Sequence, residues 1–251
     1  MTTWVLLRGL MREARHWGEF PAVFQDAVGA QNIVTPDFPG NGSLHLQTSP
    51  ASVAEMADDC RKQLKQLGYA PPYRLLALSL GAMVAVEWSA RYPEEIENMV
   101  LINTSLAPFN PFYHRLRPAN YPSLLGFFVY SSAAQRERLI LRITSKLIRT
   151  QQEQAALLNE WVGYAFDCPV TRANILRQLR AAITYRAAQT APRVPVLLLG
   201  GQQDQLVNVK CSLALAQHWD CPIRLHPTAG HDLPLDDPAW VAQQVREWRV
   251  S

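Results

Sequence analysis

Cysteine is scarce in this sequence and is not arranged for metal binding or for a disulfide framework. Among 251 residues there are only four cysteines, with no C-x-x-C or His/Cys ligand spacing between them: Cys60, Cys168, Cys211 and Cys221. Zinc sites and disulfide-rich secreted domains both depend on regularly spaced cysteines. The scattered positions predict neither, and a reducing cytoplasm is the expected location.

Long apolar runs are also missing. No stretch approaches the roughly 18–20 apolar residues that a membrane-spanning helix needs. The first apolar run, Trp4 to Leu7, ends at Arg8, so no secretory signal is predicted. The chain has no internal repeat, Walker loop or dinucleotide fingerprint, and we expect neither a metal nor an organic cofactor. With 48% hydrophobic and 18% charged residues, the chain is expected to be one globular catalytic unit.

A serine stands between a strand-like run and a helix-like run. Tyr73 to Leu78 is short and mostly apolar, and Leu80 to Arg91 carries apolar residues at helical spacing. The junction, Ala77 to Gly81, reads small-x-Ser-x-Gly. A serine at a tight strand-to-helix turn needs small flanking residues, because strand and helix crowd together there. The short motif also arises by chance, but its flanks favour Ser79 as a nucleophile.

A serine hydroxyl requires a base, and the base requires a third group that holds its tautomer. Among six histidines, His231 is the best placed, in a loop between the strand-like Pro222 to His226 and the helix-like Pro238 to Arg249. A lone loop histidine is ordinarily a solvated side chain, so the assignment depends on a matching acid. Asp232 adjoins His231 and is expected to serve local turn structure instead.

The matching acid is predicted at Asp204. The run Pro195 to Leu199 has the composition of a buried strand, Gly200-Gly201 is expected to end it, and Asp204 follows three residues later. The loop after Met99 to Asn103 offers no carboxylate. The order serine, aspartate, histidine is the one expected when later strand ends serve a nucleophile on a parallel sheet.

With these motifs the chain resembles the α/β-hydrolase superfamily over about residues 4–105 and 190–250. Asp37 to Gly42 also looks like that superfamily's loop after its fourth strand. The resemblance implies an α/β fold, with a mostly parallel central sheet flanked by helices and an inserted helical lid. The core would be 1–105 and 188–251, and the lid 106–187. The layout is most similar to the lidded carboxylesterase group that includes the pimeloyl-carrier-protein methyl ester esterase.

An oxyanion hole needs two backbone N–H donors. One is expected from Leu80, the residue after the nucleophile, and the second from a loop after an earlier strand. Trp4 to Leu7 is that strand if the superfamily's two outermost strands are absent. Leu10 is then the second donor.

The loop before Leu10 departs from the superfamily, which usually has His-Gly where this chain has Arg8-Gly9. A guanidinium carries a fixed charge and cannot act as a neutral imidazole. Arg8 is expected either to attract a carboxylate substrate or to reach solvent. Arg8, His16 and Trp17 are the candidates for the mouth of the substrate site, although Trp17 also suits a packed helix face.

The segment 106–187 interrupts the alternation of strands and helices. It begins with a proline-rich stretch, continues as several predicted helices, and holds eleven Arg or Lys against four acidic residues. Four of the cations fall at helical spacing and are predicted to share one helix face: Arg138, Arg142, Lys146 and Arg149. This face is either simply solvated or attracts an acidic protein, an anionic substrate or anionic membrane. Nucleic acid is not an expected partner, because no reading motif is present.

The sequence therefore predicts a serine hydrolase that cleaves a carboxylic ester through an acyl-enzyme, with a small-molecule or carrier-linked acyl ester as substrate. Two alternatives stay open. The same triad can act on thioesters, amides, lactones or carbon–carbon bonds, because the pocket decides the substrate. The scaffold could also serve as a non-catalytic binding protein.

Overall fold

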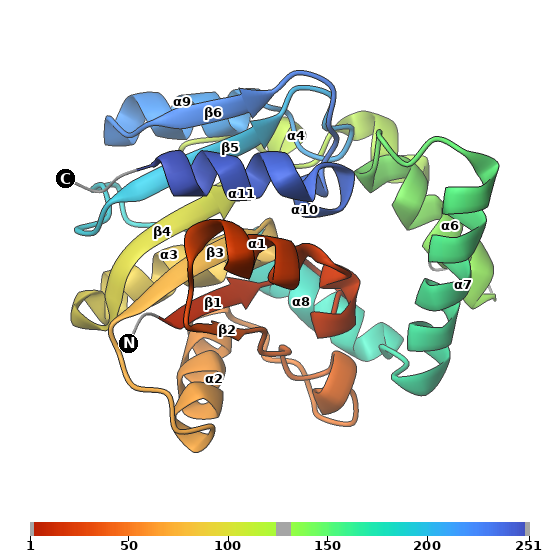
Figure 1. Cartoon of the computed structure of the whole chain (residues 1–251), viewed down its shortest axis with the longest axis horizontal. Coiled ribbons are helices and arrows are strands. Elements are labelled where there is room, and N and C mark those ends of the chain that lie inside the picture. Colours follow the sequence, from red (N-terminus) through yellow and green to blue (C-terminus); the bar gives the residue numbers. More distant parts are fainter. Residues whose placement is uncertain (1–2, 124–131, 249–251) are drawn as a thin grey trace.

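Six parallel strands form the centre of the molecule (Figure 1). The computed structural model describes residues 3–123 and 132–248. In spatial order the strands are β2 (Asn32–Val34), β1 (Thr3–Leu7), β3 (Tyr73–Leu78), β4 (Ile96–Ile102), β5 (Val196–Gly201) and β6 (Ile223–His226). Because all six run in one direction, their carboxyl ends meet at the same edge of the sheet. This edge is where α/β sheets place their ligand sites.

Helices cover both faces of the sheet, as the strand sequences require. In β1, Trp4 and Leu6 pack on one side and Val5 and Leu7 on the other, each set within its own hydrophobic core. The first core also contains residues of α1 (Phe20–Val28) and α11 (Pro238–Glu247). The second contains residues of α2 (Val53–Gln66), α3 (Leu80–Arg91) and α9 (Lys210–Trp219). The short helices outside segment 106–187 are η1 (Ala14–Trp17), η2 (Gly42–Leu44), η3 (Pro93–Glu95) and α10 (Leu233–Asp236).

The segment between β4 and β5 is helical. It contains α4 (Phe112–Arg115), η4 (Pro118–Asn120), α6 (Ala133–Thr144), α7 (Gln151–Asp167) and α8 (Arg172–Thr184). Figure 1 shows α6 and α7 beyond the strand ends, apart from the layers that cover the sheet. An isolated bridge between Ala107 and Arg186, with Ala187 N donating to Ala107 O at 2.8 Å, joins the two ends of the segment. The bridge lies next to the predicted limits 106 and 187.

Within the described ranges, the helices are too short or too polar for a membrane crossing. The four cysteines are all free thiols.

The prediction that Gly200-Gly201 ends the strand is wrong. β5 continues through Gly201. A Cβ at Gly201 would lie 2.6 Å from the carbonyl oxygen of Ala229 and closer still to that of Gly230. Glycine is needed there because the loop after β6 passes directly over the strand.

The prediction of one four-residue basic helix face is also wrong. Helix α6 ends at Thr144, so Arg138 and Arg142 lie on it while Lys146 and Arg149 do not. The carboxylate of Asp236 explains this end. It accepts the N–H of Lys146 at 3.1 and 3.0 Å and that of Leu147 at 3.1 Å, and it also accepts the hydroxyl of Ser145 at 2.6 Å. These N–H groups would otherwise continue the helix.

Candidate active site

Three strained residues gather at the carboxyl edge of the sheet. Met11, Ser79 and Asn103 have φ angles of +60°, +56° and +46° and follow β1, β3 and β4. The fourth non-glycine residue with positive φ in the described ranges, Asp220, ends α9. Such backbone conformations cost about 1–3 kcal/mol each and cluster at functional sites. Their arrangement marks this edge as the candidate active site.

Ser79 occupies the turn from β3 to α3. Its N–H donates to the carbonyl of Ile102 at 3.0 Å, which holds the turn against the end of β4. A Cβ at Gly81 would lie 2.7 Å from the carbonyl oxygen of Arg8 and closer still to that of Leu7. Helix α3 therefore starts in direct backbone contact with the loop after β1, and only glycine leaves room for this.

The loop after β1 passes beside Ser79. A Cβ at Gly9 would be 3.5 Å from the Ser79 Cβ and 4.0 Å from its Oγ. Leu80 is the first residue of α3, so its N–H has no acceptor within the helix. Among the hydrogen bonds between described residues, none uses the N–H of Leu10. Among the described residues neither predicted oxyanion donor has a hydrogen-bond acceptor, and the loop that carries Leu10 approaches Ser79 at Gly9.

Side chains from other segments hold the loop after β1 in place. The N–H of Met11 donates to Gln178 Oε1 on α8 at 2.9 Å, and the carbonyl of Arg12 accepts from Asn41 Nδ2 at 3.0 Å. Gln178 is fully buried and also donates to Asn41 Oδ1 at 2.8 Å and to Ser49 Oγ at 3.0 Å. Sequence reasoning missed Gln178, because nothing in its neighbourhood distinguishes it from a surface glutamine.

Asp204 and His231 form a buried hydrogen-bonded pair. Nδ1 of His231 lies 2.7 Å from Oδ2 of Asp204, and the two residues are 4% and 2% exposed. The other carboxylate oxygen, Oδ1, accepts the N–H groups of Leu206 and Val207 at 2.7 and 2.9 Å. Both oxygens of the carboxylate are therefore hydrogen-bonded, which fixes its orientation toward the imidazole.

The pKa of His231 is displaced by opposing effects. Burial lowers it, because an imidazolium loses its hydration inside the protein. The charge of Asp204 and its hydrogen bond raise it, Asp232 adds to this, and Arg8 opposes it. The net result is a pKa above the ordinary 6.5. A histidine base must be unprotonated to act, so a raised pKa moves the pH range in which such a base works upward.

Asn103, which sequence reasoning also missed, fixes the loop that carries His231. Its Nδ2 donates to the carbonyls of Gly230 and His231 at 3.1 and 2.7 Å, and its Oδ1 accepts the N–H of Gly201 at 2.9 Å. The side-chain amide of Asn103 thus joins β5 to the loop that carries His231. The available signal was a polar residue directly after a buried strand.

Ser79 and His231 are not hydrogen-bonded to each other in the described part of the chain. Catalytic hydrogen bonds are often long before substrate binds and tighten in the complex. The structure thus joins two predicted triad members directly, after β5 and β6, and places the third after β3 at the same edge, with β4 between.

Arg8 and Trp17 do not provide a charged or open substrate mouth. Both are 3% exposed. The two terminal nitrogens of Arg8 donate to the carboxylate of Asp232 at 3.1 and 2.7 Å, and its guanidinium lies 4.6 Å from the centre of the Trp17 ring. The expectation that Arg8 attracts substrate or reaches solvent is wrong, because its charge is buried against Asp232. The expected turn role of Asp232 is correspondingly too narrow.

His16 lies where the loop after β1 meets helices α6 and α7. Its Nε2 is 2.9 Å from a nitrogen of Arg12, which also donates to Glu137 on α6 at 2.6 Å. The guanidinium of Arg12 stacks 4.2 Å from the ring centre of Trp161 on α7. Burial and then the charge of Arg12 hold the pKa of His16 well below 6.5. His16 is therefore a neutral side chain that lies between the core and helices α6 and α7.

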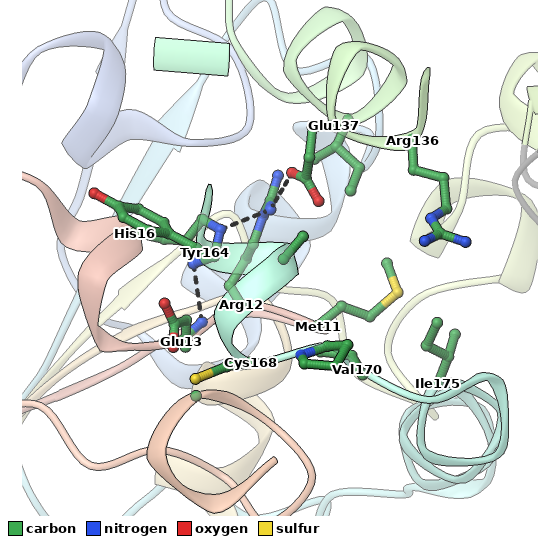
Figure 2. A pocket seen from close by; sticks show the side chains of 14 residues that line it. Met11, Arg12, Glu13, His16, Arg136, Glu137, Tyr164, Cys168, Val170 and Ile175 are labelled. Carbon is green, nitrogen blue, oxygen red and sulfur yellow. Dashed lines mark hydrogen bonds and ion pairs between the residues drawn. The ribbon is translucent and has the colours of Figure 1, made fainter. Parts of the chain in front are cut away.

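A cavity of about 60 Å³ adjoins this cluster (Figure 2). It is lined by Met11, Arg12, Glu13, His16, Gly42, Arg136, Glu137, Ile140, Tyr164, Ala165, Cys168, Pro169, Val170 and Ile175. None of Ser79, Asp204 and His231 lines it; the nearest part of the predicted oxyanion loop is Met11. In the described ranges, no three His, Cys, Asp or Glu side chains are grouped to hold a metal ion.

The comparison with known proteins settles the family. The sequence profile of the alpha/beta hydrolase family matches residues 4–244, nearly the whole chain. The chain belongs to this family. The strand order and the loops at the carboxyl edge are thus those of an alpha/beta hydrolase.

Two solved structures show how widely this fold is used. The chain aligns with a thermophilic esterase from Thermogutta terrifontis at a TM-score of 0.75 and 20% identity, covering 99% of this chain and 89% of the esterase. It aligns with the 2-hydroxy-6-oxo-6-phenylhexa-2,4-dienoate hydrolase of a Rhodococcus species at 0.78 and 18%, covering 98% and 89%. At these identities the likeness establishes the fold alone.

A curated relative is the biotin biosynthesis bifunctional protein BioHC of Teredinibacter turnerae, 25% identical over 261 aligned positions. The match covers 97% of this chain and 44% of that protein, so the chain spans less than half of its relative's length.

Proposed function

We propose that this alpha/beta hydrolase is a serine hydrolase that cleaves a carboxylic ester through an acyl-enzyme. The observation that supports this most is the buried Asp204–His231 hydrogen bond of 2.7 Å on the sheet edge that carries the strained Ser79. A histidine oriented by a buried carboxylate is the arrangement that activates a serine hydroxyl.

The proposed reaction uses each group once in each half. Ser79 Oγ attacks the ester carbonyl while His231 takes its proton, and the N–H groups of Leu80 and Leu10 bind the oxyanion. His231 then gives the proton to the departing alcohol oxygen, which leaves an acyl group on Ser79. Water repeats the sequence and releases the acid. Asp204 keeps Nδ1 protonated, so that Nε2 is the basic nitrogen throughout.

The lid would have to adjust for a substantial acyl chain. Ligand pockets usually measure about 300–1,000 Å³, whereas the cavity beside Met11 holds about 60 Å³. Its apolar lining, from Met11, Ile140, Val170 and Ile175, suits an acyl chain. We infer that segment 106–187 acts as a lid. The acyl chain of the substrate would enter between α6 and the loop after β1.

The resemblance to the group that includes the pimeloyl-carrier-protein methyl ester esterase favours a carrier-linked acyl ester as one substrate class, and the similarity to a biotin biosynthesis protein agrees with this. Arg138 and Arg142 remain exposed on α6 and would attract such a carrier. A cytoplasmic location, inferred from the scattered cysteines, stays a prediction.

A panel of p-nitrophenyl esters and thioesters of increasing chain length tests the proposal. Ser79→Ala should reduce kcat by about 10⁶-fold, and Asp204→Asn by about 10⁴-fold because the imidazole loses its correct tautomer. Ser89→Ala is the matched control and should keep activity. Ser89 is a buried serine of α3, the helix that follows Ser79, and its hydroxyl donates to the Val86 carbonyl.

Turnover that survives Ser79→Ala would mean that the nucleophile is misassigned. No turnover of any ester or thioester by the unmodified protein would favour a binding protein on a hydrolase scaffold.

A further inference from the structure

A buried ion pair connects the two loops on which the proposed chemistry depends. Arg8 and Asp232, 224 positions apart, meet through two parallel hydrogen bonds of 3.1 and 2.7 Å. Their side chains are 3% and 6% exposed. None of the proposed steps of nucleophilic attack, proton transfer or oxyanion binding uses either charge, so the pair needs its own explanation.

Stability alone is a poor explanation. Removing two charges from water costs several kcal/mol per ion, and apolar replacements of buried ion pairs are often neutral or stabilising. The Nε of Arg8 is also buried and has no hydrogen-bond partner among the described residues. A fork-shaped contact is, however, a strong constraint on geometry, since both bonds form only at one relative orientation of the two groups.

The geometry that the pair constrains is that of the proposed site. Arg8 directly precedes Gly9, which packs against Ser79, and its own carbonyl approaches Gly81. Asp232 directly follows His231, and its N–H donates to the carbonyl of Thr144 at the end of α6 at 2.8 Å. The pair therefore joins the loop after β1, which carries Leu10 and is called the oxyanion loop here, to the loop after β6, which carries His231 and is called the base loop. The end of α6 attaches at the same point.

The pair also lies in the electrostatic field of the base. Three charged groups act on His231: Asp204 through its hydrogen bond, and Asp232 and Arg8 with opposite signs. Two others, Asp236 and Lys146, lie against Gly230, where Asp236 accepts the glycine N–H at 2.6 Å. Since Arg8 and Asp232 oppose each other, loss of either one exposes His231 to an unbalanced charge.

We propose that Arg8 and Asp232 are a positioning pair, which sets the base loop against the oxyanion loop and keeps the charge around His231 balanced. The proposal rests on the proposed function, since it assigns His231 the role of base. Neither residue touches the reacting atoms; both act through the loops that carry Leu10 and His231.

The test compares four variants: Arg8→Met, Asp232→Asn, the double variant, and Arg8→Lys. The readouts are kcat against pH, and the NMR titration of the His231 imidazole in a Ser79→Ala background, assigned by the signal that His231→Gln removes. Asp232→Asn should lower the pKa of His231 and Arg8→Met should raise it, because each variant leaves the opposite charge unbalanced near the imidazole. The uncharged double variant should return it to the wild-type value.

The positioning role of the pair is tested by measuring kcat. The double variant should keep its wild-type pH midpoint yet lose about 10²-fold in kcat, because the loops are no longer held together. Arg8→Lys should do the same, since it keeps the charge and loses the fork. The exposed pair Arg74–Glu97, with an N–O distance of 2.6 Å, offers the control: Arg74→Met with Glu97→Gln should change neither readout.

Single variants that shift the titration in the same direction, or not at all, would overturn the charge-balancing role. A double variant with wild-type kcat would overturn the positioning role. If either single variant fails to fold, the double variant and Arg8→Lys still decide the positioning role, because neither leaves an unpaired charge. A shifted His231 titration in the double variant would still overturn the charge-balancing role. The NMR titration needs no turnover, so failure of the proposed function in the Ser79→Ala assay is distinguishable from failure of the pair.

Discussion

The carboxyl edge of the sheet and the helical segment 106–187 are held by different kinds of contact. At the edge, the strand ends are connected one to the next: Asn103 bonds the loop after β6 to β5, and Asp204 bonds His231. In the lid, large apolar side chains face solvent, with Phe166 85% and Ile183 71% exposed. Directional polar bonds such as Gln178 to Met11 attach it to the core.

This difference assigns separate roles to the two regions. Close backbone approach at the edge leaves little freedom, which suits groups that must hold one geometry. The lid has fewer buried apolar contacts and is therefore expected to open at a lower free energy than the core. As the proposed lid, segment 106–187 would then accept substrates of different length while the edge stays constant.

The largest expected effect is the loss of stability when one methyl group is added at the carboxyl edge of the sheet. In Gly201→Ala the added Cβ would overlap the carbonyls of Ala229 and Gly230, and backbone cannot rotate away as a side chain can. We expect a loss of about 3 kcal/mol or more in the free energy of unfolding, measured by urea denaturation.

The lid supplies the matched control for that substitution. Gly163 on α7 is exposed and has open space around it, so Gly163→Ala should stabilise the protein by about 0.5–1 kcal/mol through helix propensity. Equal effects of the two substitutions would contradict the contrast between edge and lid.

An intermediate effect is expected where lid and edge meet. Gln178→Leu removes the acceptor of the N–H of the strained Met11 and the donor that bonds Asn41 and Ser49. We expect kcat/KM for a short ester to fall by about 10²-fold, because the neighbouring donor Leu10 is displaced. Gln154→Leu, on the exposed side of α7, should leave kcat/KM unchanged. A wild-type rate in Gln178→Leu would show that the lid does not set the loop.

The smallest effect is expected from the lid's surface charge. The double variant Arg138→Gln/Arg142→Gln should hydrolyse small p-nitrophenyl esters at the wild-type rate. With an acyl ester linked to an acidic carrier protein, the kcat/KM of the double variant should be below that of the wild type at low salt. At high salt the two values should converge, because screening removes the attraction between the arginines of the wild type and the acidic carrier. A deficit that does not depend on salt would contradict electrostatic attraction by α6.

Local patterns were enough for the elements around the nucleophile. The strand Tyr73–Leu78 and the helix Leu80–Arg91 have the predicted bounds, because apolar strand length, helical spacing and a small-residue turn all act over a few neighbouring residues. The alpha/beta hydrolase fold is confirmed for the same reason, since its motifs are short and follow a set order. Asp204 and His231 could be paired because each follows a strand-like run and both come after Ser79 in the expected order.

Contacts between distant segments were beyond local pattern. Helix α6 ends where Asp236 takes its N–H groups, and Gly201 belongs to a strand because a loop crosses above it. Arg8 looked like a surface charge until the fold brought Asp232 to it. The sequence by itself determined which strands and helices form and in which order. Only the tertiary structure decided which charges are buried together, because burial and pairing depend on atoms that lie far apart along the chain.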